Sequence, residues 1–256
     1  MPSVVRILWG WRWAVFLALT AGVGEASGQS SITSDRPGIG SGSAIVEPGV
    51  IQLESGASYA GAEGTHAYSI GEVFLRYGVG GLELELLLNS FTAVRSEDPN
   101  GFRTEGLQDA GLGVKLPLFR SPDGRANVSL QGLLAVPTGV DAFTDDEWVP
   151  AVNALADLSI SERVALALNV GYRAGPGTLE NGVSVSVTPG VALSGGFGLY
   201  GGWAGSFSGG EATHFGESGL TYLLNEGVQL DLNSGWSVDT ADWFFGGGVA
   251  VRWGAP

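Results

Sequence analysis

The sequence predicts an all-β protein, a single antiparallel transmembrane β-barrel of about 12 strands. Three observations support this fold class. Large apolar residues alternate with polar or small residues over most of the chain, as strands with one lipid-facing side require. Beyond residue 28 there is no run of about 18 apolar residues, the length needed for a membrane-spanning helix. An aromatic-rich segment, Trp243–Trp253, lies close to the C-terminus.

This last segment has the pattern of a strand with one apolar face. That face carries Trp243, Phe245, Val249, Val251 and Trp253, and the other, mixed face carries Phe244, Gly246, Gly248, Ala250 and Arg252. An apolar edge of this kind promotes aggregation in a soluble domain. In an outer-membrane barrel the last strand pairs with the first and faces lipid. We also expect the barrel-assembly machinery to bind this strand.

Similar segments follow one another from about residue 50 without a convincing helix. In the segment 228–236, for example, Leu230 and Leu232 alternate with Gln229 and Asp231. The predicted strands cover residues 50–60, 66–78, 81–92, 106–118, 126–137, 148–160, 163–173, 182–194, 196–207, 213–224, 227–238 and 242–253. Short turns alternate loosely with longer polar loops, as in barrels with short periplasmic turns.

The N-terminal region predicts export. Arg6 and Arg12 form a positive region before an apolar run over residues 14–23, and small residues follow at Ala26 and Gly28. We predict a signal peptide over residues 1–28; cleavage after Ala26 and an uncleaved anchor helix are the alternatives. An N-terminal periplasmic arm would then cover residues 29–49, and the outer-membrane barrel residues 50–253.

Composition excludes several classes of function. The chain has no cysteine, so disulfides and thiol chemistry are excluded. The formal charge of −14 argues against binding nucleic acid, because both partners would be anionic. The acidic loops are compatible with contacts to outer-membrane lipid and, through divalent cations, to lipopolysaccharide.

The residues suited to catalysis or metal binding do not form a recognisable motif. Only His66 and His214 supply imidazoles, with Ser69 and Ser218 nearby in sequence. Neither histidine has metal-ligand spacing, and the turn of a nucleophile elbow does not fit a barrel. We expect no catalytic residue, no metal and no cofactor.

Charged residues recur on the inward face of several predicted strands. Glu72 and Arg76 lie inward on the second strand, and the turn 78–81 brings Arg76 across from Glu83, with Glu85 one step further. Asp109 and Lys115 lie inward on the fourth strand, and Arg252 on the last. Such charges either fill a narrow lumen with ion pairs or create a field that filters solutes. We predict that all seven line the lumen.

Several short motifs resemble a known family. They are Asp35-Arg-Pro-Gly38, Pro48-Gly-Val-Ile-Gln-Leu-Glu54, Phe74-Leu-Arg-Tyr-Gly78, Gly106-Leu-Gln-Asp-Ala-Gly-Leu-Gly-Val-Lys115, Leu134-Ala-Val-Pro-Thr-Gly139 and the closing strand. Together they are similar to the outer-membrane transporters named for the meta-pathway of phenol degradation. The resemblance implies a barrel in the outer membrane of a Gram-negative bacterium and the passage of aromatic compounds. One departure is that Gly254-Ala-Pro256 follows the terminal aromatic residue.

The expected function is an outer-membrane channel or transporter that passes small aromatic or polar solutes by passive diffusion. The main alternative is a structural or surface barrel that transports nothing, with a lumen closed by ion pairs. A soluble periplasmic β-sandwich or barrel is the third possibility.

Overall fold

The structure of the chain is a computed structural model that describes residues 32–36, 39–88, 90–98, 100–177 and 180–254. The predicted signal peptide, residues 1–28, lies outside these ranges. Within them, the chain forms no helix that is long and apolar enough to cross a membrane.

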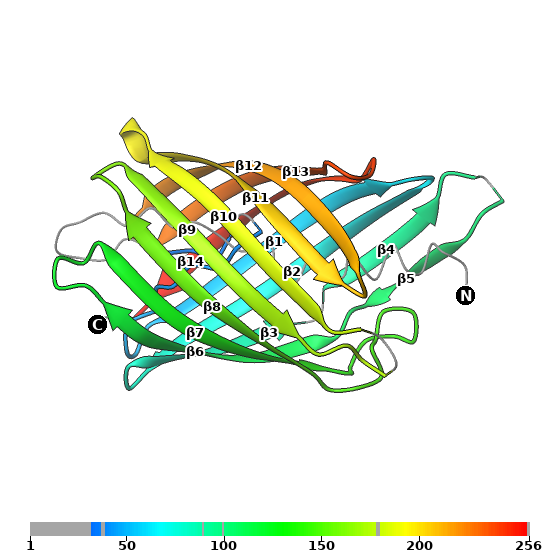
Figure 1. The fold of residues 1–256 in the computed structure, drawn as a ribbon, viewed down its shortest axis with the longest axis horizontal. Coiled ribbons are helices and arrows are strands. Elements are labelled where there is room, and N and C mark those ends of the chain that lie inside the picture. Colours follow the sequence, from blue (N-terminus) through cyan, green and yellow to red (C-terminus); the bar gives the residue numbers. More distant parts are fainter. Residues whose placement is uncertain (1–31, 37–38, 89, 99, 178–179, 255–256) are drawn as a thin grey trace.

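In the described residues, fourteen strands make up a single antiparallel sheet (Figure 1). They are β1 (Ile51–Ala62), β2 (Thr65–Val79), β3 (Leu82–Leu88), β4 (Phe91–Ser96), β5 (Arg103–Leu107), β6 (Ala110–Arg120), β7 (Ala126–Val136), β8 (Val149–Ser159), β9 (Val164–Arg173), β10 (Gly182–Ala192), β11 (Phe197–Ser208), β12 (Glu211–Asn225), β13 (Val228–Ser237) and β14 (Trp243–Trp253). A 3-10 turn, Ser194–Gly196, lies between β10 and β11.

The sheet closes on itself. β1 pairs with β2 on one side and with β14 on the other, where Ile51 lies opposite Trp253. β3 and β4 both pair with β2, and β6 and β5 pair with β3 and β4 in turn. β3 and β4 therefore form one interrupted strand of the wall, and β5 and β6 form a second. The wall thus has 12 strands, and the prediction of a closed antiparallel barrel of about 12 strands is confirmed.

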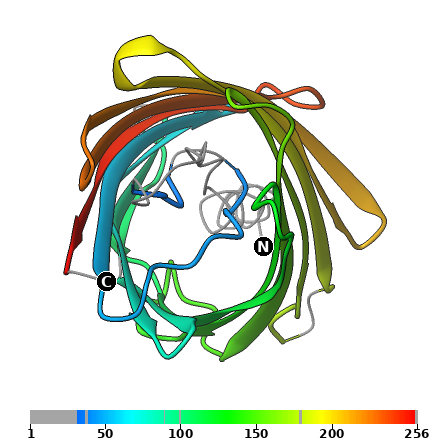
Figure 2. The ribbon, with the colours of Figure 1, turned by 90° about the vertical axis from the view of Figure 1, so that its left-hand side faces the viewer.

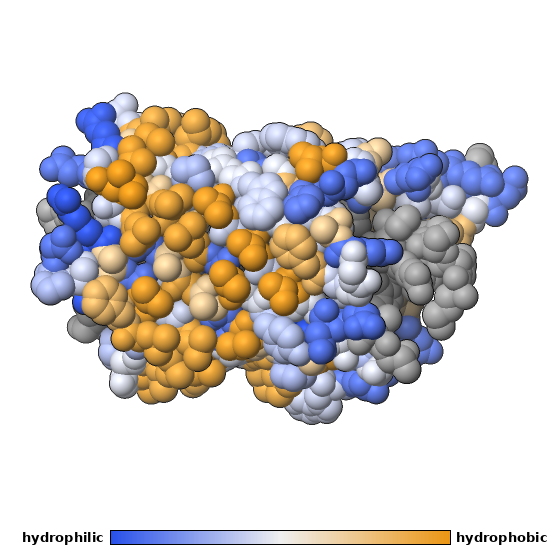
Figure 3. All heavy atoms as spheres, viewed as in Figure 1, coloured by the Kyte–Doolittle hydropathy of each residue, from blue (hydrophilic) through white to orange (hydrophobic). Residues whose placement is uncertain are grey.

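The outer surface carries the apolar residues. Leu232 is 63% exposed and Phe245 is 59% exposed, whereas Asp231 and Ala250 on the opposite parity are buried. Apolar side chains form a broad band over the strands, with polar residues at both ends of the molecule (Figure 3). An apolar band between polar ends is the surface that a membrane-spanning barrel presents to lipid.

The two ends of the barrel differ in their connections. The end that contains the start of β1 and the end of β14 has the turns 80–81, 121–125, 160–163, 193–196 and 226–227. The opposite end carries the longest connections, 137–148 and 174–181, together with the protruding β4 and β5 hairpin (Figure 1). Because short turns are periplasmic and longer loops extracellular in such barrels, we infer that Trp253 lies at the periplasmic end.

The segment before β1 lies inside the barrel. Residues 32–36 and 39–49, which we call the inner segment, cross the interior of the ring (Figure 2). These residues are mostly buried, with Ile32 and Val46 at 4% and 2% exposure. The expectation of a periplasmic arm over 29–49 is corrected for these residues, because the barrel wall supplies their hydrogen-bond partners. Residues 29–31, 37 and 38 lie outside the described ranges.

Candidate functional site

The inner segment is held by side chains of the barrel wall. Ile39 N donates to Glu217 Oε2 on β12 at 2.6 Å, and Val46 N donates to Glu83 Oε2 on β3 at 2.7 Å. Ser43 donates through both N and Oγ to Asp157 Oδ2 on β8, at 2.6 and 2.7 Å. An irregular segment in a closed space needs such partners, because unpaired buried backbone groups are costly. The wall carboxylates therefore accept hydrogen bonds from backbone N–H groups of this segment, as the carbonyl groups of a neighbouring strand do in a sheet.

Glu54 on β1 binds the start of the inner segment. Its carboxylate accepts hydrogen bonds from Ser34 Oγ, Asp35 N and Arg36 N at 2.9, 2.9 and 2.8 Å. Gln52, two residues earlier on the same inward face, donates from Nε2 to Glu54 Oε1 at 2.8 Å. These contacts fix the backbone at the position from which Asp35 and Arg36 extend in different directions.

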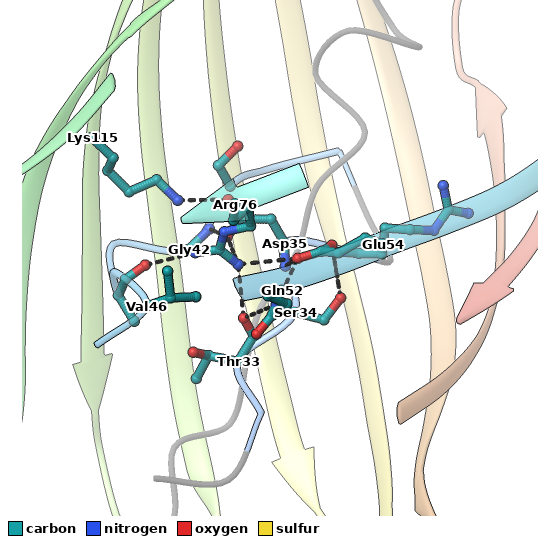
Figure 4. Close-up of polar contacts among 12 residues, drawn as sticks. Thr33, Ser34, Asp35, Gly42, Val46, Gln52, Glu54, Arg76 and Lys115 are labelled. Atoms are coloured by element: carbon teal, nitrogen blue, oxygen red, sulfur yellow. Dashed lines mark hydrogen bonds and ion pairs between the residues drawn. The ribbon is translucent and has the colours of Figure 1, made fainter. Parts of the chain in front are cut away.

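Arg76 on β2 is the centre of the charged interior (Figure 4). Its guanidinium donates to both oxygens of Glu83 at 2.8 and 2.9 Å and to Glu54 Oε1 at 3.1 Å. The remaining donors bind the inner segment itself, at the carbonyl oxygens of Thr33 and Ala44, at 2.8 and 3.0 Å. Because the side chain is fully buried, each donor requires a partner of this kind.

Lys115 on β6 lies beside Arg76 and joins the wall to Asp35. Its Nζ donates to Asp35 Oδ2 at 2.5 Å and lies 3.6 Å from Glu83 Oε1 and from Glu85 Oε1. Asp35, Glu83 and Glu85 bring carboxylate oxygens within 4.8 Å of one another, a spacing compatible with a metal ion. The Lys115 ammonium supplies the positive charge among these carboxylates, so the cluster is satisfied as an ion pair network.

Asp35 is the acidic residue that the inner segment contributes to this network. Burial raises the pKa of its carboxyl above the ordinary value of 3.8, and the charges of Arg76 and Lys115 oppose that rise. Gly42 N donates to Asp35 Oδ1 at 3.2 Å, so the carboxyl also folds the inner segment back on itself.

Arg36 occupies a separate position on the wall, between two carboxylates. Its Nη1 donates to Glu72 Oε2 on β2 at 2.8 Å, and its Nε lies 3.6 Å from Asp231 Oδ2 on β13. Glu72, Gly56, Gly248 and Asp231 stand opposite one another on four adjacent strands. Gly71, with φ of 73°, is the extra residue of the bulge that places Glu72 opposite Gly56. We call this row of four residues the arginine socket.

The two glycines make room for the guanidinium. A Cβ atom on Gly56 would clash with Arg36 Nη2, and one on Gly248 would lie 2.6 Å from Arg36 Nε. The planar group therefore lies against the backbone of β14 and β1, and its Nη2 donates to the Gly247 carbonyl at 3.3 Å. Glycine at these two positions allows a close approach that any other residue prevents.

The structure places five of the seven predicted lumen residues around the inner segment: Glu72, Arg76, Glu83, Glu85 and Lys115. The register between β2 and β3 differs from the expected one, since Arg76 is paired with Glu85 and Gly78 with Glu83. Arg76 reaches Glu83 diagonally, while Glu85 accepts two hydrogen bonds from Gln131 at 3.0 and 2.9 Å.

The other two predicted residues lie away from this cluster. Asp109, between β5 and β6, accepts hydrogen bonds from the backbone of Thr138, Gly139 and Asp145 at 3.1, 2.9 and 2.9 Å. It thus holds the long loop 137–148 at the extracellular end. Arg252 donates to Glu47 Oε2 at 2.7 Å, where the inner segment reaches the periplasmic end.

Several participants were not predicted as lumen residues from the sequence, among them Asp35, Arg36, Glu54 and Asp231. Glu54 and Asp231 follow the inward alternation of β1 and β13, and that signal could have found them. Asp35 and Arg36 lie in an irregular segment without periodicity, so only their place in a family motif pointed to them.

His66 and His214 contact side chains other than Ser69 and Ser218. His66 Nε2 lies 2.8 Å from Glu97, whereas Ser69 Oγ is 2.7 Å from Thr92 Oγ1. His214 stacks on Trp203, and Ser218 Oγ is 3.2 Å from Ser234 Oγ.

The wall around the inner segment is strongly acidic. Among the described residues that bind the inner segment or its charged neighbours, three wall side chains are cationic: Arg76, Lys115 and Arg252. Seven are carboxylates: Glu54, Glu72, Glu83, Glu85, Asp157, Glu217 and Asp231. The inner segment adds two acidic residues, Asp35 and Glu47, and one basic residue, Arg36. The interior of the barrel therefore carries an excess of negative charge.

Solved structures with a similar fold are outer-membrane proteins. The crystal structure of the COG4313 outer membrane channel from Pseudomonas putida F1 superposes with a TM-score of 0.65 at 16% identity, over 82% of this chain and 97% of that chain. The NanC porin gives 0.55 at 8% identity, over 78% and 98% of the two chains. The KdgM porin gives 0.52 at 9%, over 77% and 98%. At these identities the likeness shows the fold, that of a bacterial outer-membrane barrel.

No curated protein matches the sequence. A family model does match, and it covers residues 34–253, from the inner segment to the end of β14. The match includes Asp35, Arg36 and every wall residue that binds them. The chain belongs to the family described as "Putative MetA-pathway of phenol degradation".

Proposed function

We propose that the protein is an outer-membrane channel for small polar solutes, closed in this conformation by its inner segment. One observation carries the proposal. The buried charges of the wall are neutralised and hydrogen-bonded in large part by the inner segment, and not by one another alone. Without that segment the same groups line a polar passage along the barrel axis.

The chemistry of these contacts favours a segment that can leave. They are hydrogen bonds and ion pairs to carboxylates, and water can replace each of them when the lumen fills with solvent. A barrel closed permanently by its own wall residues does not need a segment in its lumen whose contacts water can replace. An interior of about 12 strands is also wider than the eight-stranded barrels that wall side chains alone fill.

The acidic wall predicts the class of solute. Seven carboxylates and three cations (Arg76, Lys115 and Arg252) remain around the described lumen when Asp35, Arg36 and Glu47 are removed with the inner segment. A passage lined by one sign of charge concentrates ions of the opposite sign. We therefore expect small cations and polar neutral solutes to pass in preference to anions, by passive diffusion.

A second candidate function is a structural barrel with a permanently closed lumen. The complete burial of Arg76 and Lys115 favours it, because fully desolvated ion pairs are difficult to open. The two candidates differ in whether the inner segment moves.

A reversible cross-link tests this difference. Ser129 Oγ on β7 lies 2.5 Å from the Ser43 carbonyl, so Ser43→Cys with Ser129→Cys places one thiol on the inner segment and one on the wall. The natural chain has no cysteine, and the introduced pair can therefore be oxidised without competition. In planar bilayers we expect conductance from the reduced protein, cation selectivity, and closure on oxidation.

The two single-cysteine variants are the controls and should conduct under both conditions. Absence of conductance in the natural protein and in the reduced double variant would support the structural barrel. Anion preference would contradict the assignment of the solute class but not the movement of the inner segment.

A further inference from the structure

The arginine socket has the features of a binding site for a cationic group. Its two carboxylates, Glu72 and Asp231, face each other across Gly56 and Gly248, and the Arg36 guanidinium lies between them. Glu72 is further oriented by Ser58, whose hydroxyl donates to Glu72 Oε1 at 2.7 Å. The carboxylate is thus fixed by a wall residue whether or not Arg36 is present.

Arg36 satisfies only part of this site. Among the described residues, neither oxygen of Asp231 has a hydrogen-bond partner, although that side chain is fully buried. In the described part of the chain, Arg36 Nε, Asn233 Oδ1 and the Tyr200 hydroxyl are also buried without a hydrogen-bond partner. The 3.6 Å separation of Arg36 from Asp231 exceeds the usual 2.7–2.9 Å of a charge-assisted hydrogen bond. The socket therefore offers a cation more acceptors than Arg36 uses.

We propose that the arginine socket is a binding site in the lumen for guanidinium-bearing solutes, and that Arg36 is its internal occupant. This inference rests on the proposed channel function, since in the natural protein Arg36 fills the socket and a solute reaches it only when the inner segment leaves. Release of Arg36 and entry of a solute guanidinium are then alternative ways of filling one site. Such a solute binds the open state in preference to the closed one and shifts the population toward it.

The shape of the socket selects a planar cation. The glycine backbone leaves a flat, shallow space, which a guanidinium enters side-on while donating to carboxylates at both edges. An ammonium group is compact and cannot span two carboxylates in one plane. Anions are repelled by Glu72 and Asp231, and a neutral planar molecule such as urea lacks the charge that compensates them.

The test removes the internal occupant and supplies the probe in solution. Guanidinium chloride at millimolar concentration is titrated calorimetrically into the detergent-solubilised R36A protein, at ionic strength matched with sodium chloride. We expect guanidinium to bind at least about tenfold more tightly to R36A than to the natural protein, equivalent to about 1.4 kcal/mol. Methylammonium should bind more weakly, and urea should not bind.

A second substitution assigns the binding to the socket. R36A/D231N should lose at least about tenfold of the guanidinium affinity. Heat-dependent gel mobility confirms that each variant is folded, and R36M, which keeps an apolar stem, replaces R36A if the latter does not fold. Equal affinities in R36A and the natural protein, or affinity unaffected by D231N, would overturn the proposal.

The binding measurement is independent of transport. Guanidinium binding without conductance in any variant would support the socket and contradict the channel. Conductance without guanidinium binding would support the channel and contradict the socket.

Discussion

Lys115 Nζ donates to Asp35 Oδ2 at 2.5 Å, and this pair joins a strand of the wall to the inner segment across 80 positions of sequence. Both side chains are buried, and Glu83 and Glu85 each place an oxygen 3.6 Å from the same ammonium. One cation therefore serves three carboxylates. Lys115 therefore stabilises the inner segment through its contact with Asp35 and also by compensating the charges of Glu83 and Glu85 beside it.

Replacing Lys115 with methionine should weaken the binding of the inner segment. The substitution keeps the length of the stem but leaves Asp35, Glu83 and Glu85 without their shared cation. Removing one partner of a buried ion pair costs about 3–5 kcal/mol. We expect the inner segment of K115M to become sensitive to protease in folded protein, and the conductance of the channel to rise.

The control for this experiment is R103M. Arg103 donates to Glu105 at 2.6 Å on the exposed β4 and β5 hairpin, and solvent screens such a pair. Its loss should leave protease resistance and conductance as they are. Comparable changes in K115M and R103M would show that Lys115 does not hold the inner segment.

Replacing Gly56 with alanine should displace Arg36 without removing any charge. The nearest atoms to the new methyl group all belong to the Arg36 guanidinium, which has to leave the wall. G132A is the matched control, because a Cβ there makes ordinary contact with Val114 at 3.7 Å. We expect G56A, but not G132A, to increase the open probability in single-channel recordings. An unchanged open probability in G56A would mean that Arg36 does not contribute to closure.

Most of the wall could be predicted from the sequence, because strand alternation is a local signal with a period of two. Leu230 and Leu232 face lipid while Asp231 faces the interior, as their alternation indicates. The inward charges Arg76, Glu83 and Lys115 follow from the same parity. Two strands of the wall are interrupted, one between β3 and β4 and the other between β5 and β6. The alternation gives no signal for these breaks, so it predicts one continuous strand in each place.

The location of the inner segment could not be predicted in the same way. Residues 32–36 and 39–49 lack periodicity, and their structure depends on contacts with residues as distant as Asn169 and Glu217. The register error at Arg76 has a related cause. A turn defined only by the glycines of 78–81 allows pairings that differ by two residues, and the observed turn has Gly80 and Gly81 at positive φ.

The buried Asp35 predicts that acid favours the closed state. Its pKa is raised by burial, with Glu54 and Glu83 acting in the same direction and Arg76 and Lys115 opposing. A carboxyl with a raised pKa binds protons more tightly when the inner segment is docked than when it is released. Docking is therefore strengthened as pH falls from neutral toward the ordinary value of 3.8 and weakened as pH rises. Single-channel recordings should show a lower open probability at pH 5 than at pH 7.

The D35N substitution identifies the titrating group. Asparagine resembles the protonated carboxyl and retains an oxygen for the hydrogen bond from Gly42 N. In D35N the difference in open probability between the two pH values should shrink. A natural protein that opens on acidification, or a D35N variant with the full pH response, would contradict this assignment.

The lipid-facing surface gives a depth-dependent prediction. Leu232 is 63% exposed near the middle of β13, and Val238 is 64% exposed just after that strand at the extracellular rim. Arginine on the lipid face costs about 2–4 kcal/mol near the bilayer midplane and about 0–1 kcal/mol near the interface. In unfolding titrations from lipid vesicles, L232R should therefore lose several times more stability than V238R, because only the guanidinium of L232R has to enter hydrocarbon. Equal losses would mean that the membrane does not span β13 at this depth.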